Sequence, residues 1–117
     1  MSLSFEDDAA RLLSALNQDE QEHAVAYLTE VIVEGDARLS LPGVELRIRT
    51  ASRLGFIDQD PTANWGHPAR YVLLPSDGVG HLISTPARYP PFARPDALKW
   101  RVVYRASGLP ETAVHPC

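Results

Sequence analysis

Residues 62–81, TANWGHPARYVLLPSDGVGH, contain the side chains of this chain that are best suited to chemistry or binding. A histidine can serve as a general base near neutral pH if a partner orients it and a pocket admits a substrate. His67 is therefore a candidate catalytic residue, with Asp58 or Asp60 as an acidic partner. Trp65 is a candidate contact residue, because tryptophan and arginine are enriched at binding hot spots.

Other reaction classes lack their motifs. A structural zinc site needs four nitrogen or sulfur ligands in closely spaced pairs, and the histidines, like the single cysteine Cys117, form no such set. No serine stands in a G-x-S-x-G turn, and the glycines of residues 78–80 precede no helix that could hold a phosphate. We therefore expect no metal site and no cofactor, and the sequence favours a protein that is not an enzyme.

The charged residues are divided unevenly along the chain. Residues 1–36 carry a net charge of −8, and residues 37–117 carry +4, which together give the net charge of −4. Nine of the ten cationic residues beyond residue 36 are arginines, and an arginine side chain can bind a carboxylate or a phosphate through two parallel hydrogen bonds. The second part of the chain is therefore expected to carry the surface that meets an anionic partner.

We also expect neither a membrane-spanning segment nor a secretory signal. No apolar run reaches the roughly 18 residues that a membrane-spanning helix needs, and the N-terminal segment is acidic where a secretory signal would be basic. A single cysteine gives no internal disulfide. We expect a soluble, cytoplasmic protein without membrane contact.

The elements that must position these side chains begin with two predicted helices in residues 1–36. Ser4 is a suitable N-cap for the first helix, and Asn17 with Glu20 resembles a capping box for the second. We expect the acidic pairs at residues 7–8 and 19–20 to lie on solvated helix faces. The apolar residues of the two helices recur at spacings of three and four: Phe5, Ala9, Leu12, Leu13 and Leu16, then Ala24, Tyr27, Leu28, Val31 and Ile32.

Beyond residue 36 the period changes to two, which indicates strands. Residues 37–41 and 44–49 alternate on either side of a Pro-Gly turn, residues 69–74 and 81–85 form a second hairpin, and residues 98–106 alternate again. One alternative stays open at residues 44–54, where the apolar spacing also fits a helix that ends at Gly55. Four prolines in residues 86–95 predict an extended crossing.

These elements predict an α+β fold in which an N-terminal two-helix hairpin packs on one face of a mostly antiparallel sheet of about five strands. The chain of 117 residues fits a single domain. Within it we distinguish an acidic helical part (1–36), a β-rich part (37–106) and a loose tail (107–117).

An arginine-rich sheet face follows if residues 44–49 and 98–106 lie in one sheet with their apolar sides under the helices. Arg47, Arg49, Arg101 and Arg105 would then point outward together with Lys99. Trp100 and Tyr104 would point inward, which argues against a stacking platform for single-stranded nucleic acid. The pI near 5.5 argues against nucleic acid as well.

We therefore expect a small non-enzymatic protein-binding module, of the inhibitor, immunity or accessory type. Its binding residues would be Trp65 and His67 in the loop of residues 58–68, and Arg47, Arg49, Arg101 and Arg105 on the sheet. A first alternative is a small enzyme or ligand-binding domain that uses His67 in a pocket between helices and sheet. A second is a nucleic-acid binder, sheet-based or winged-helix-like. A strand over residues 98–106 at a sheet edge could also pair across a two-fold axis to give a homodimer.

Overall fold

The computed structural model describes residues 4–41, 43–61, 68–76, 82–89 and 98–109. The described helices are α1 (Phe5–Ser14) and α2 (Gln18–His23). The described strands are β1 (Val25–Thr29), β2 (Ala37–Leu41), β3 (Val44–Ile48), β4 (Ser52–Asp58), β5 (Ala69–Pro75), β6 (Ile83–Ala87) and β7 (Trp100–Arg105).

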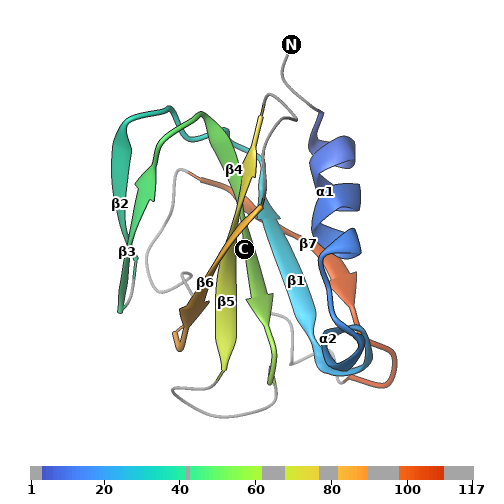
Figure 1. The fold of residues 1–117 in the computed structure, drawn as a ribbon. Helices are drawn as coiled ribbons and strands as arrows, with labels where there is room; N and C mark the ends of the chain where they lie inside the picture. Colours follow the sequence, from blue (N-terminus) through green and yellow to red (C-terminus); the bar gives the residue numbers. More distant parts are fainter. Residues whose placement is uncertain (1–3, 42, 62–67, 77–81, 90–97, 110–117) are drawn as a thin grey trace.

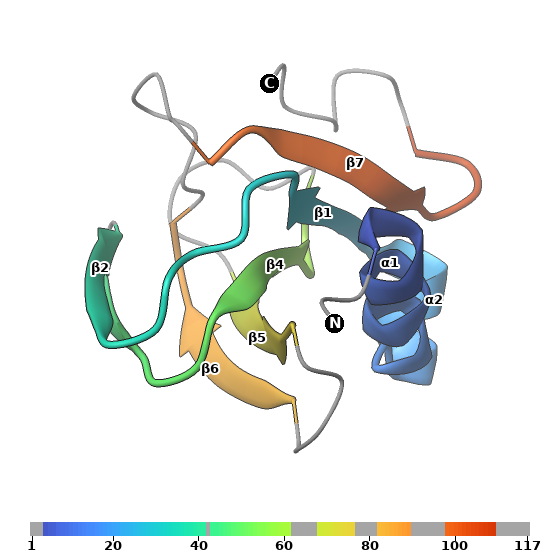
Figure 2. The same cartoon turned by 90° about the horizontal axis from the view of Figure 1, so that it is seen from above.

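Five of the strands form one antiparallel sheet in the order β6-β5-β4-β1-β7, and β2 and β3 form a separate antiparallel hairpin. The helices lie on one side of the five-stranded sheet and the hairpin on the other (Figures 1 and 2). The predicted α+β class and the mostly antiparallel sheet of five strands are confirmed. Among the described residues, no helix has the length and apolar character needed to cross a membrane.

Each face of the sheet has its own apolar core. The helix-side core consists of Leu12, Leu16, Ala24, Ala26, Leu28, Ile57, Val72 and Leu74. The hairpin-side core consists of Val25, Tyr27, Leu46, Ile48, Leu54, Phe56, Ala69, Tyr71, Leu73, Ala87 and Trp100. Tyr27, Phe56 and Tyr71 are register partners on β1, β4 and β5, with ring centroids 6.0 and 5.1 Å apart. This aromatic row crosses the middle of the sheet.

The second predicted helix is much shorter than expected, so the predicted two-helix hairpin is not confirmed. The capping box of Asn17 and Glu20 forms, but α2 ends at His23 and Ala24 is already extended, with φ −93° and ψ 161°. The residues that were expected to continue the helix form β1, which is buried along its whole length. A strand covered on both faces is apolar at successive positions, and periodicity alone does not separate it from a buried helix.

The helical alternative for residues 44–54 is wrong, because β3 and β4 are both strands. The third helix that a winged-helix arrangement needs at this place is therefore not formed. The two predicted hairpins are confirmed: β2 pairs with β3 around the turn, with Leu41 opposite Val44, and β5 pairs with β6. Gly43 supplies the positive φ of 73° that the first turn requires.

Two buried carboxylates fasten the helices to the sheet, which corrects the expectation that these acids face solvent. Asp8 of α1 is fully buried and lies 2.8 Å from guanidinium nitrogens of Arg11 and of Arg53 on β4. Glu20 of α2 is 1% exposed, and both of its oxygens accept hydrogen bonds of 2.8 Å from Arg70 on β5. Burying a charge is costly unless it is paired, so these contacts fix where the helices dock.

The pKa of Glu20 is lowered by its partners. Burial alone raises the pKa of this carboxyl, but hydrogen bonds from the Arg70 side chain, the Asn17 backbone and the Gln59 side chain, with the attraction of the Arg70 charge, outweigh that effect. The carboxylate therefore stays ionised below the usual pKa of about 4.3.

A pH dependence of stability follows from this lowered pKa. The contribution of ionised Glu20 is fully present above the unfolded pKa, near 4.3, and is lost as the pH falls through the lower folded pKa. The stability difference between wild type and Glu20→Gln should therefore shrink as the pH is lowered from about 5 to about 3, since glutamine does not titrate. Urea unfolding across this range measures it. A difference that stays constant with pH would contradict the assignment.

Candidate binding surface

The outer face of the β2–β3 hairpin gathers three arginines. The inner face packs Leu46 and Ile48 into the hairpin-side core, so the alternating residues face away from it. Arg38 stands directly opposite Arg47 in the antiparallel register, and exposed Arg49 follows the end of β3. We call the three residues Arg38, Arg47 and Arg49 the hairpin arginine face.

Among the residues that the structure describes, Glu45 is the acid that forms an ion pair with this face. Glu45 lies on the same side of the hairpin, with a carboxylate oxygen 3.7 Å from a guanidinium nitrogen of Arg38, and both side chains are largely exposed, at 60% and 73%. An exposed ion pair at this distance contributes little free energy, so Glu45 neutralises Arg38 only weakly. Within the described ranges, neither Arg47 nor Arg49 forms an ion pair with an acidic side chain.

The other two predicted arginines lie on β7, in the five-stranded sheet. The prediction that residues 44–49 and 98–106 share one sheet is therefore wrong. Arg101 is opposite Leu28 of the helix-side core; its guanidinium lies 4.5 Å from the ring centroid of Phe5 and 3.3 Å from Glu30. Arg105 is exposed at the other end of the strand.

A bulge in β7 also overturns the predicted alternation. Ala26 pairs with Tyr104 and the next residue, Tyr27, pairs with Val102, so that Val103 is an extra residue. A bulge of this kind reverses the faces of the side chains that follow it. As a result, Trp100 and Tyr104 pack against opposite cores.

The bulge equally separates the two arginines of β7. Arg101 lies on the helix side, whereas Arg105 is opposite Val25 of the hairpin-side core. Nothing in the sequence of residues 98–106 indicates this bulge. Arg38, by contrast, was within reach of sequence reasoning, because a two-residue turn at residues 42–43 places it opposite Arg47.

Trp65 and His67 lie outside the described residues, as does most of the loop that contains them. At the base of this loop the Gln59 N–H donates to the carbonyl of Pro68 over 3.1 Å. Of the two candidate acidic partners of His67, Asp58 is fully buried at the end of β4, and Asp60 is exposed. Asp58 accepts a hydrogen bond from the backbone N–H of Asp60.

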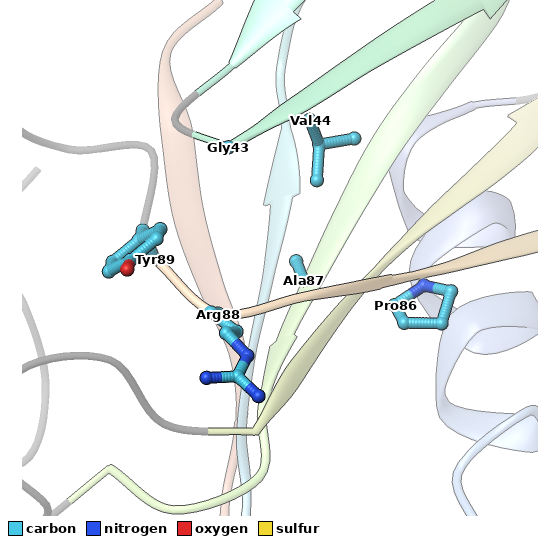
Figure 3. A pocket seen from close by; sticks show the side chains of 6 residues that line it. All are labelled: Gly43, Val44, Pro86, Ala87, Arg88 and Tyr89. Atoms are coloured by element: carbon cyan, nitrogen blue, oxygen red, sulfur yellow. The ribbon is translucent and has the colours of Figure 1, made fainter.

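A hollow of about 230 Å³ lies at the tip of the hairpin, between the turn and the end of β6. Val44 and Ala87 face one another across it, and the Arg88 guanidinium extends away from Val44 (Figure 3). The walls are mainly apolar: Gly43, Val44, Pro86, Ala87, Arg88 and Tyr89. The hollow lies on the hairpin side of the sheet. The alternative function with His67 predicts a pocket between the helices and the sheet, and the helix-side core packs at that place.

The described residues bring together no group of three or more His, Cys, Asp or Glu side chains that could hold a metal ion. The arrangement instead offers exposed cations on a hairpin whose inner face packs into the hairpin-side core, and such a surface is suited to binding anionic groups. Comparisons with protein-family models, with curated protein sequences and with solved structures find no match to this chain.

Proposed function

We propose that this protein is a small non-enzymatic binding module, of the inhibitor, immunity or accessory type, whose hairpin arginine face contacts an acidic surface of a partner protein. Trp65 and His67 of the loop complete the proposed contact, as an aromatic anchor and a polar neighbour. The proposal accounts for three of the cations in the second part of the chain, Arg38, Arg47 and Arg49, which are exposed on a hairpin whose inner face packs into the hairpin-side core.

The observation that carries the proposal is the pairing of Arg38 with Arg47. Like charges directly opposite one another on neighbouring strands are destabilising, and the two side chains are register partners on the exposed face of β2 and β3. A partner carboxylate placed between the two guanidinium groups would turn this repulsion into two charge-assisted contacts. The free protein thus carries a small cost that binding relieves.

The chemistry of this face favours a protein over a nucleic acid. Platforms for single-stranded nucleic acid combine cations with aromatic rings on which bases stack, and the outward residues of β2 and β3 are Arg38, Ser40, Glu45 and Arg47, none of them aromatic. The net charge of −4 at pH 7 also opposes binding to a polyanion through long-range attraction.

The test is a charge reversal that affects binding and stability in opposite directions. In Arg47→Glu, a carboxylate replaces the cation opposite Arg38, so we expect the free energy of unfolding to rise by a few tenths of a kcal/mol. The same change should weaken capture of the partner by about tenfold or more. Urea unfolding measures the first effect, and quantitative affinity capture from cells that produce the protein measures the second.

Ile83→Glu is the matched control, because it places the same carboxylate at an exposed position on β6, outside the hairpin. We expect it to retain the captured protein in one-to-one amount. Equal capture by wild type and Arg47→Glu would contradict the proposal. Capture that disappears after nuclease treatment would contradict it as well, since nucleic acid would then be the ligand.

A further inference from the structure

Strand β7 is an outer strand of the five-stranded sheet, and its inner edge pairs with β1. Within the described residues, no strand pairs with its outer edge. The N–H and C=O groups of such an edge are a template on which an extended chain can add by main-chain hydrogen bonds. This edge is distinct from the hairpin arginine face.

The two edges of the sheet differ in how well they are protected. Strand β6, at the opposite edge, contains Pro86, which has no backbone N–H to donate and interrupts a ladder. Strand β7 (Trp100–Arg105) contains no proline. Its Val102 is 40% exposed, although Tyr27, its register partner on β1, is fully buried. Among the described strands, the outer edge of β7 is thus the better template, with an apolar side chain near its centre.

The charges along β7 indicate what kind of chain would add. Lys99, Arg101 and Arg105 flank Val102 and are all exposed, and Glu30 is the acidic side chain described in contact with Arg101. Two copies of β7 paired across a two-fold axis would bring these cations together, and like charges disfavour that contact. An acidic segment would be attracted instead.

The bulge in β7 specifies the pattern of this segment. Side chains opposite one another in a ladder share a face, so an added strand would meet Arg101 on the helix side and Val102 on the hairpin side. If its pairing skips Val103, as the pairing of β1 does, the next two partners are Tyr104 and Arg105. The complementary order is acid, apolar, apolar, acid, which reads the same in both chain directions.

We propose that the outer edge of β7 accepts an extended acidic segment of another protein as an added strand, with an apolar residue against Val102 and carboxylates against Arg101 and Arg105. Main-chain hydrogen bonds would supply the general affinity, and the two flanking arginines would select the acidic pattern. The homodimer considered from sequence is the competing occupant of the same edge.

The probe is a labelled synthetic peptide with the core Glu-Val-Val-Glu, compared with the same peptide built on Lys-Val-Val-Lys. We expect the Glu peptide to bind at least about tenfold more tightly, and to shift the backbone amide resonances of β7 rather than those of β6. Arg105→Glu and Val102→Glu should each lose most of this binding. Ile83→Glu, which places the same charge at an exposed position on the opposite edge, should retain it.

Arg47→Glu separates this inference from the proposed function, because it should leave peptide binding unchanged while it weakens capture of the partner. Equal binding of the two peptides, or resonance shifts confined to β2, β3 or β6, would overturn the inference. So would a concentration-dependent dimer in sedimentation that Val102→Glu dissociates, since a second copy would then occupy the edge. Should Val102→Glu fail to fold, Arg105→Glu alone decides, since its side chain is exposed at the end of β7.

Discussion

Asp8→Ala should lower the free energy of unfolding by about 3–5 kcal/mol, which is a large share of the 5–15 kcal/mol typical of a domain. Asp8 is fully buried and bridges Arg11 and Arg53, each at 2.8 Å. Arg53 is only 8% exposed. In Asp8→Ala its buried guanidinium loses the carboxylate that pairs with it between helix and sheet, which is costly. Urea unfolding near neutral pH measures the loss.

Glu6→Ala is the matched control for this prediction, because Glu6 precedes Asp8 by two positions in α1 and is exposed. It should change the stability by no more than about 0.5 kcal/mol. Replacing both partners, as Asp8→Leu with Arg53→Met, should recover more than half of the loss, since apolar pairs often substitute for buried ion pairs. A loss below about 1 kcal/mol in Asp8→Ala would contradict a bridging role.

The burial of Asp8 shows why part of this fold was beyond sequence reasoning. In the sequence, Asp7 and Asp8 are equivalent acids in the first turn of a helix, where both suit the helix dipole. Asp7 remains exposed and closes the capping box with Ser4, whereas Asp8 faces the sheet and meets Arg53, 45 residues further along. A single sequence records the helix but not which residue of a distant strand lies beneath it.

The strands also divide into those that the sequence predicts and those that it does not. β2, β3 and their pairing were predictable, because each strand has one exposed face and a recognisable turn joins them, which together give alternation and register. The pairing of β5 with β6 was predictable from its turn residues, although β5 has no exposed face. β1 was not, because both of its faces are buried and it lacks alternation. The candidate binding surface was predictable only in part. The sequence identifies the arginines by residue type, but which of them lie together depends on the sheet that each strand joins and on the bulge at Val103.

Gly55→Val is the second change for which we expect a large effect. Val is a better strand former than Gly, so the replacement should stabilise β4 if local preference decides. A Cβ atom at Gly55 would, however, lie 2.7 and 2.9 Å from the two methyl carbons of Leu12, and Leu12 is fully buried. We expect a loss of about 1–3 kcal/mol or more in the free energy of unfolding, because overpacking displaces α1.

Two results test whether Gly55 makes room for α1: the sign of the stability change in Gly55→Val, and the coupling of that change to Leu12→Ala. From sequence, this glycine resembled the end of a helix. Leu12→Ala alone should cost about 2–5 kcal/mol, because it leaves a cavity. In the double variant the new valine occupies part of that cavity, so the combined loss should fall short of the sum by about 0.5–3 kcal/mol. Additive losses, or a stabilised Gly55→Val, would show that α1 does not rest on Gly55. Helix α1 lies close to the sheet because β4 presents hydrogen in place of a side chain beneath Leu12, and Asp8, one turn away, meets Arg53 on the same strand.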